Sequence, residues 1–225
     1  MVHKPKKISL PIFPIPMGIF NYGKDNHNLN KRLVDDILTE VEKDSEGKVR
    51  SNFGGWHSQD GLENRYDSFR ELQSIITSCA NEYCEGNGFK EGLISYDLWA
   101  NINESGDMNA GHHHGSTALA GVYYPAESII DDKINFNYTD KNPIRHGIWD
   151  GKNGGSLYFQ DPCYGLKNSL AKKDSRTPYT IDCYHTYPVA SMLILFPSYL
   201  IHTVTPFKET KKRISISFAC NYERH

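Results

Sequence analysis

The sequence predicts a mainly β protein with flanking helices, built as an antiparallel sandwich or barrel that two helices precede. Apolar residues recur at helical spacing in two segments before residue 92 and alternate with polar residues from Ile94 onward. The later apolar runs are short and separated by turn residues, which favours antiparallel pairing over a parallel βαβ sheet. No change of composition marks a linker. We therefore expect a single domain over residues 1–225, with an arm and helices in 1–92 and the β core in 93–222.

The N-terminal part predicts an extended arm and two amphipathic helices. Three prolines alternate within residues 8–22, which excludes a central strand and favours an edge strand or an arm laid across the core. Apolar residues in 33–41 form an i, i+4, i+8 stripe, which predicts a helix of about four turns. After the Gly-rich turn at 51–60, a second stripe over 69–83 predicts a second helix.

The remaining chain predicts a series of short strands. From Ile94 to Ile102 every second residue is apolar or aromatic, as in a strand with one buried face. The polar segments 138–155 and 167–176 are expected loops, and the stretch 125–178 is expected to frame the substrate entrance. The predicted strands lie near residues 94–103, 108–115, 117–124, 132–137, 155–160, 179–187, 190–196, 199–205 and 213–220.

Composition excludes several classes of protein. Lys and Arg number 25 against 27 Asp and Glu, so there is no general electrostatic reason to expect binding to nucleic acid or an anionic membrane. The apolar runs are far shorter than the roughly 18 residues of a membrane-spanning helix, which predicts a soluble, cytoplasmic protein. Five scattered cysteines without a CxxC pair argue against a disulfide framework and a thiolate zinc site.

Three consecutive histidines open an apolar run and are the strongest chemical signal. In an extended segment His112 and His114 share one face while His113 points away. His202 ends another apolar run far downstream. Imidazole suits iron, zinc, copper and nickel, so His112, His114 and His202 predict a facial metal site with open coordination positions. The alternative is a solvated loop, or partly buried imidazoles that only form hydrogen bonds.

Arg213 is the second chemical signal. It begins the alternating run RISISF, in which Ser215 lies on the same face. Burying a guanidinium is costly without an anion, whereas an inward-facing arginine recognises a carboxylate bidentately. The alternative is an exposed arginine at a strand start beside Lys211 and Lys212.

Four segments carry a family resemblance: GDMNAGHHHGSTALAGVYYP, GGSLYFQDP, LFPSYLIHTVTPF and RISISF. In order and spacing they resemble the double-stranded β-helix core of the Fe(II)- and 2-oxoglutarate-dependent oxygenases. The chain is more closely similar to the small prolyl-4-hydroxylase-like group of bacterial and phage proteins. The segments NFGGWHS and DLWANIN resemble the N-terminal half of that group, so the likeness covers roughly residues 8–222.

The resemblance implies a jelly-roll, cupin-like core with the two N-terminal helices packed on it. It implies Fe(II), 2-oxoglutarate and O2 as cofactor and co-substrates, with iron bound by His112 and His202. Arg213, together with Ser215 on its face, is implied to bind the distal carboxylate of 2-oxoglutarate, and Tyr124 corresponds to a tyrosine that hydrogen-bonds that carboxylate in prolyl hydroxylases.

One departure from the family pattern concerns the third metal ligand. The superfamily usually presents His-x-Asp or His-x-Glu, whereas His114 stands here at the position of the carboxylate. An imidazole in that place leaves one more positive charge at the metal and favours anionic co-ligands. Asp107 or Glu104 in the preceding loop is the alternative ligand.

Three further residues are assigned to the surroundings of the site. Asn103 stands where prolyl hydroxylases usually have a tyrosine, so the pocket should differ in shape and polarity. Asn109 is expected to orient a ligand. Trp56, with His57, is either a packed aromatic over a tight bend or part of the substrate pocket.

The predicted activity is hydroxylation of a protein side chain or a small molecule, with release of succinate and CO2. A three-histidine cupin-type dioxygenase that does not use 2-oxoglutarate is one rival. A non-catalytic metal-binding jelly roll, with histidines around a structural zinc, is the other. No residue pattern identifies the prime substrate, and the sequence is compatible with a homodimer.

Overall fold

The computed structural model describes residues 14–130, 133–136, 144–146, 154–163, 181–206 and 210–222. Both predicted helices are confirmed as α1 (His27–Lys43) and α2 (Asp67–Asn87). Two 3-10 helices, Gly23–Asn26 and Leu62–Asn64, precede α1 and α2 respectively. Within the described residues, no helix has the length and apolarity that crossing a membrane requires.

Helix α2 ends at a glycine for a geometric reason. Gly88 has φ of 69°, in the left-handed region where a side chain is disfavoured. Its N–H donates to the carbonyl of Glu85, and the N–H of Phe89 donates to that of Cys84 at 2.8 Å. These bonds satisfy carbonyls that the helix end would otherwise leave without partners.

The first of two six-stranded sheets, both antiparallel throughout, supports one wall of the site. The predicted arm is confirmed as an edge strand over part of its length, since β1 pairs with β12 and with no other strand among the described residues. The strands in spatial order are β1 (Gly18–Asn21), β12 (Met192–Pro197), β6 (Leu119–Tyr124), β14 (Arg213–Tyr222), β4 (Leu93–Asn103) and β3 (Trp56–His57).

The second sheet supports the opposite wall. Its strands in spatial order are β2 (Asn52–Phe53), β5 (Met108–His112), β13 (His202–Val204), β10 (Leu157–Gln160), β11 (Cys183–Thr186) and β9 (Ile144–His146). Strands β7 (Ser128–Ile130) and β8 (Lys133–Asn135) form a separate hairpin. Strands β2, β3, β7 and β9 were not predicted, because two or three residues are too few to show a period. The predicted loop at 167–176 lies outside the described residues.

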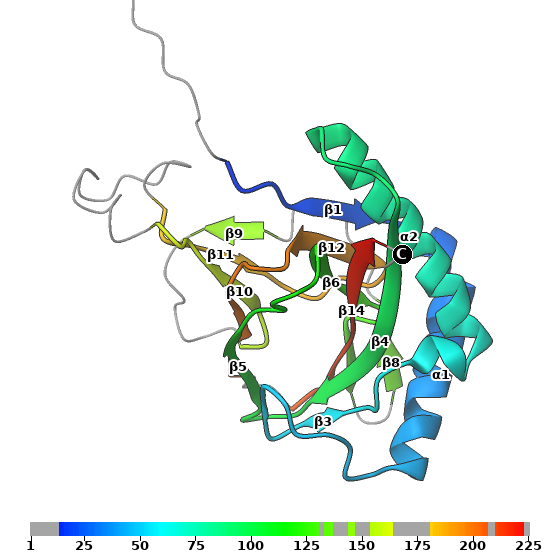
Figure 1. The fold of residues 1–225 in the computed structure, drawn as a ribbon. Helices are drawn as coiled ribbons and strands as arrows, with labels where there is room; N and C mark the ends of the chain where they lie inside the picture. The colour runs from blue at the N-terminus through cyan, green and yellow to red at the C-terminus, as the bar shows by residue number, and fades with distance from the viewer. Residues whose placement is uncertain are drawn as a thin grey trace, which may run out of the picture.

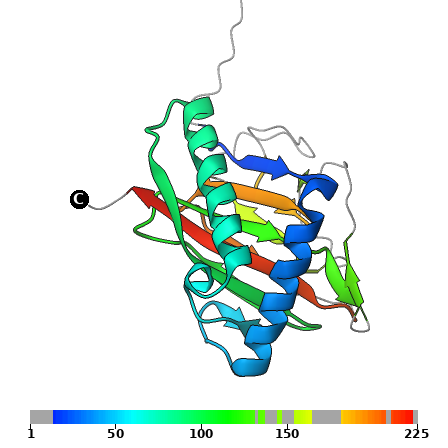
Figure 2. The same ribbon diagram turned by 90° about the vertical axis from the view of Figure 1, so that its right-hand side faces the viewer.

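The elements stack in three layers. Both helices cover one face of the first sheet, and the second sheet lies on its other face (Figures 1 and 2). One apolar cluster joins α1 and α2 to the first sheet, and another joins the inner faces of the two sheets. The predicted mainly β jelly-roll architecture with two helices packed on it is confirmed.

The alternation predicted for β4 holds for only part of the strand. Leu98, Ala100 and Ile102 are buried as expected, but Ile94 is 40% exposed while Leu93 is buried. The pairing of β4 with β14 shifts register between residues 96 and 99. This bulge reverses which face the earlier residues occupy.

Candidate functional site

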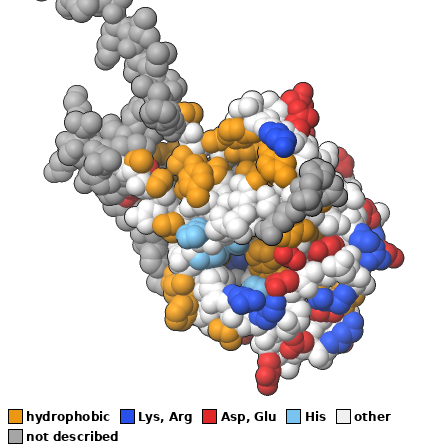
Figure 3. Space-filling model, viewed as in Figure 1, with side chains coloured by type: hydrophobic (Ala, Val, Ile, Leu, Met, Phe, Trp, Pro, Cys, Tyr) orange, Lys and Arg blue, Asp and Glu red, His pale blue; other side chains and the backbone are white. Residues whose placement is uncertain are grey.

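A cavity of about 830 Å³ opens between the two sheets. Its inner end is lined by the buried Arg213 and Ser215 of β14, and its outer end by Asp60, Tyr96 and the exposed Asp97. Figure 3 shows histidine side chains bordering a hollow in this face of the molecule, with charged side chains gathered beside it.

The three predicted histidines converge in the middle of this cavity. Strand pairing sets His202 directly opposite His112, and the N–H of His114 donates to the carbonyl of Ser198 at 2.9 Å. One ring nitrogen from each of His112, His114 and His202 lies within 4.8 Å of the others. His113 is exposed, and its Nδ1 accepts the N–H of Gly115, so the prediction that it points away is confirmed.

Backbone hydrogen bonds set the tautomer of two of these rings. The Nδ1–H of His112 donates to the carbonyl of Ala110 at 2.8 Å, and that of His202 to the carbonyl of Leu200 at 2.9 Å. In each ring the proton on Nδ1 leaves the lone pair of Nε2 available. Such outer hydrogen bonds are the usual means of orienting a histidine toward a metal.

The three rings are held neutral. Burial, and then the nearby His112, lower the pKa of His202 to about 3. Burial and then the neighbouring His112 lower the pKa of His114 to about 4, and burial also lowers the pKa of His112. Three neutral imidazoles with convergent nitrogens fit a transition-metal ion such as Fe(II).

Arg213 is only 2% exposed, so the alternative of a surface arginine is wrong. Its Nη1 donates to Ser215 Oγ at 2.9 Å and to Asn103 Oδ1 at 3.2 Å. Its Nη2 donates to the hydroxyl of Tyr124 at 3.1 Å, and its Nε to the carbonyl of Gly155 at 3.0 Å.

All of these partners of Arg213 are neutral. No carboxylate among the described residues lies within ion-pair distance of its guanidinium, although burying a charge without a counter-ion is strongly unfavourable. An anionic ligand entering the cavity would supply that counter-ion. The inner end therefore fits a carboxylate such as the distal one of 2-oxoglutarate.

Asn103 and Asn109 join the site through Arg213. Asn103 Nδ2 donates to Asn109 Oδ1 at 3.3 Å, and Asn109 Nδ2 donates to Ser51 Oγ at 3.3 Å. Asn109 also lines the cavity. The two amide side chains thus support one side of the Arg213 guanidinium. Among the described residues, they make no hydrogen bond to the three histidines.

Asp107 and Glu104, the alternative ligands, lie apart from the histidines. Asp107 Oδ2 accepts the N–H of Glu104 at 2.6 Å, and its carboxylate packs where a side chain on Gly54 would stand. Glu104 pairs with Lys212 at 2.9 Å. Within the described chain the convergent group contains the histidines alone.

Trp56 is not brought to the cavity. It belongs to the apolar cluster beneath the helices, and its indole N–H donates to the carbonyl of Asp44 at 2.7 Å. Its neighbour His57 lines the cavity instead and stacks on Trp99 at 5.9 Å between ring centroids.

Several cavity residues were not predicted as part of the site, among them Asp97 and Asn101 of β4. Alternation along the strand places Trp99, Asn101 and Asn103 on one face, and this pattern was available in the sequence. The alternation alone predicts one buried face, and nothing in the sequence shows that a second sheet covers the other.

Comparison with known proteins identifies the family. A family model described as "Putative 2OG-Fe(II) oxygenase" matches residues 97–219, a span that holds the three histidines and Arg213. A search of curated proteins found no matching sequence.

The same fold occurs in solved structures of proteins that differ in their named activities. A prolyl-4-hydroxylase of Pseudomonas putida is 12% identical with a TM-score of 0.59, over 93% of this chain and 94% of that chain. The non-heme alpha ketoglutarate dependent epimerase SnoN from nogalamycin biosynthesis is 14% identical with a TM-score of 0.59, over 92% and 77%. HygX from Streptomyces hygroscopicus, solved with nickel and 2-oxoglutarate, is 10% identical with a TM-score of 0.52, over 92% and 83%.

At these identities the solved structures establish the fold, while the family match spans more than half of the chain. By that match, the chain belongs to the Fe(II)- and 2-oxoglutarate-dependent oxygenases.

Proposed function

We propose that His112, His114 and His202 bind Fe(II) and that Arg213, Tyr124 and Ser215 bind the distal carboxylate of 2-oxoglutarate. The buried guanidinium of Arg213, with no carboxylate partner among the described residues, carries this assignment. It favours a 2-oxoglutarate enzyme over a three-histidine dioxygenase without that co-substrate, which has no use for a buried cation at the inner end.

Residues at different positions in the cavity would have different roles. Neutral imidazoles donate lone pairs to the metal, and Arg213 orients 2-oxoglutarate from its far end. Val122, Leu157, Phe196 and Val204 line the cavity and exclude water from it. When bound, Fe(II) and 2-oxoglutarate supply the oxidising chemistry, in which O2 is consumed and succinate and CO2 are released.

The reaction on the prime substrate would be hydroxylation at a C–H bond of a protein side chain or a small molecule, in a prolyl-4-hydroxylase-like site. Asn103, which stands where a tyrosine was expected, is buried against Arg213, so the surroundings of 2-oxoglutarate should differ from those in the prolyl hydroxylases. A single domain, a cytoplasmic location and a homodimer remain predictions from the sequence.

Anaerobic titration with Fe(II) and 2-oxoglutarate tests this function. We expect a metal-to-ligand charge-transfer band on addition of both, and succinate formation when O2 is admitted. Absence of the band together with absence of succinate would contradict the assignment.

The ligand at position 114 needs its own test. We expect His114→Ala to weaken Fe(II) binding strongly, and His114→Asp to restore it, because a carboxylate stands at this position in most of the superfamily. An unchanged Fe(II) affinity in His114→Ala would show that His114 is not a ligand.

A further inference from the structure

The outer end of the cavity is built on the bulge in β4. Ser217 pairs with Trp99 and Ala219 with Tyr96, so β4 holds one extra residue between these pairs. Asp97 has φ of 50° there, a left-handed conformation that residues with side chains rarely adopt. Consequently two consecutive residues, Tyr96 and Asp97, both line the cavity, which regular alternation would not allow.

A buried carboxylate holds this bulge in place. Glu63 is 6% exposed, and its two oxygens accept the N–H of Asp97 at 3.1 Å and the N–H of Leu98 at 3.0 Å. Hydrogen bonds to an ionised acceptor are stronger than those between neutral groups. The fold thus maintains an unusual backbone conformation where an acidic side chain borders the cavity.

The carboxylate of Asp97 has no hydrogen-bond or ion-pair partner among the described residues. Burial raises its pKa and the charge of Asp60 raises it further, while Lys48 opposes them. Asp60 also lines the cavity and forms an ion pair with Lys48. The other outer cation, Arg50, lines the cavity from the segment before β2, on the side of the second sheet.

Asn101 independently indicates that this part of the cavity accepts hydrogen bonds from a ligand. It is 6% exposed and lines the cavity, and its Nδ2 donates to Ser217 Oγ at 3.3 Å. Its Oδ1 accepts no hydrogen bond from any described residue. An amide oxygen without a protein partner at a cavity wall can accept a hydrogen bond from a donor on the ligand.

Trp99 connects this acidic end with the histidines. Its ring centroid lies 5.8 Å from that of His114. Asp97 lies two residues before Trp99 on the same strand and lines the same cavity.

We propose that the prime substrate carries a positively charged nitrogen, an alkylammonium or guanidinium group, and that Asp97 selects it, with Asn101 accepting a hydrogen bond from the same ligand. This rests on the proposed function, which makes the cavity the binding site of the prime substrate. The cation belongs either to a small amine or to the side chain of a basic residue in a peptide.

A matched series of probes tests the charge preference in the wild-type protein. n-Butylammonium, 1-butanol and butanoate have similar chains and differ in charge. Each is titrated into the protein without metal or 2-oxoglutarate, and again into the Fe(II) and 2-oxoglutarate complex without O2, with the indole resonance of Trp99 followed by NMR. We expect n-butylammonium to bind at least tenfold more tightly than the other two.

The variant Asp97→Asn tests the residue itself. Asparagine has nearly the same shape and tolerates the left-handed conformation, so the bulge should persist. We expect at least a fivefold loss of n-butylammonium affinity, with the affinity for 1-butanol unchanged. Asp35→Asn on the exposed face of α1, outside the cavity, makes the same charge change and should leave both affinities unchanged.

The two sources of the cation are separated by comparing n-butylammonium with N-acetyl-lysine amide. Tighter binding of the amide indicates a basic side chain in a peptide, and tighter binding of the simple amine indicates a small molecule; either result supports the inference. Equal affinities for n-butylammonium and 1-butanol in the wild type would overturn it, whether or not Fe(II) and 2-oxoglutarate bind. Failure of Fe(II) and 2-oxoglutarate to bind would overturn the proposed function instead.

Discussion

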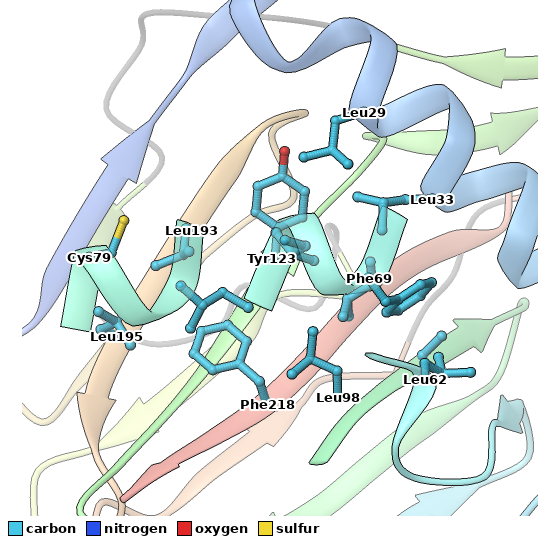
Figure 4. Packing of buried hydrophobic residues seen from close by; sticks show 14 of the residues in the cluster. Leu29, Leu33, Leu62, Phe69, Cys79, Leu98, Tyr123, Leu193, Leu195 and Phe218 are labelled. Atoms are coloured by element: carbon cyan, nitrogen blue, oxygen red, sulfur yellow. The ribbon is translucent and has the colours of Figure 1, made fainter. Parts of the chain in front are cut away.

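The two faces of the first sheet have opposite chemistry although the same strands build both. On β4, Leu98 and its same-face neighbours pack under the helices, and Figure 4 shows Leu98 and Phe218 among the side chains of that apolar cluster. On the other face, Arg213 lines the inner end of the cavity and donates a hydrogen bond to Asn103. Because side chains alternate along a strand, one face supplies stability while the other is free to hold charges.

The largest effect is expected at the metal end of the cavity face. Removal of a residue that only orients a metal ligand costs about 10- to 100-fold in metal affinity. We therefore expect His202→Ala to lower Fe(II) affinity by more than about 100-fold and to abolish succinate formation. His113→Ala is the matched control, since His113 is exposed and outside the convergent group. Equal losses in both variants would contradict the assignment.

Arg213→Met should lower the affinity for 2-oxoglutarate with little effect on the stability of the free protein. Loss of one partner of a buried charge pair costs about 2–5 kcal/mol, so we expect 2-oxoglutarate affinity to fall by about 100-fold. The free protein should not become less stable by more than about 1 kcal/mol, because a buried charge without a counter-ion is removed. Calorimetry measures both quantities. A large loss of stability with unchanged affinity would instead make Arg213 a structural residue.

A substitution on the helix-covered face should lower stability and leave 2-oxoglutarate affinity nearly unchanged. Leu98→Ala removes a fully buried side chain and should lower the free energy of unfolding by about 2–5 kcal/mol. 2-Oxoglutarate affinity of the folded protein should stay within twofold of the wild type. Asn101→Ala, on the cavity face of the same strand, should cost about 1 kcal/mol. Denaturant unfolding measures the free energy of unfolding of both variants. Equal losses of stability in Leu98→Ala and Asn101→Ala would contradict the distinction between the two faces.

The two faces should lose stability at opposite ends of the pH scale. In metal-free protein, His114 and His202 take up protons only near pH 4 and pH 3, whereas in the unfolded chain they do so near 6.5. The unfolded state therefore binds more protons between these values, and stability falls as the pH decreases from about 6.5. Saturating Fe(II) should reduce this loss.

On the helix face, burial raises the pKa of Cys220 from 9.0 to about 12. The folded state retains this proton after the unfolded state has released it, so stability falls as the pH rises above about 9. Thermal unfolding across the pH range measures both losses. Cys220→Ala should reduce only the alkaline loss, and a reduced acid loss in that variant would contradict the separation.

The smallest effect is expected at Asp107. Asp107→Asn should leave Fe(II) affinity within twofold of the wild type, because the carboxylate lies in the turn with Glu104 and not among the histidines. Lost turn contacts should lower stability by about 1 kcal/mol. A tenfold loss of Fe(II) affinity would restore Asp107 as a ligand candidate.

Local patterns in the sequence were sufficient to predict the two helices, most of the strands and the residues expected to bind the metal and 2-oxoglutarate. Periods of 3.6 and 2 reflect which face of an element is buried, so α1, α2 and the later part of β4 were predictable. The HHH run and the start of RISISF predicted the cluster and Arg213, because these side chains are costly to bury without a ligand.

Only the tertiary structure decided how distant segments meet. The pairing of β13 with β5 places His202 opposite His112, and no local pattern encodes that register. The bulge that brings Tyr96 and Asp97 into the cavity depends on Glu63, more than thirty residues earlier in the chain. Long-range pairing and packing determine such contacts, whereas sequence periodicity reports only on neighbours within one element.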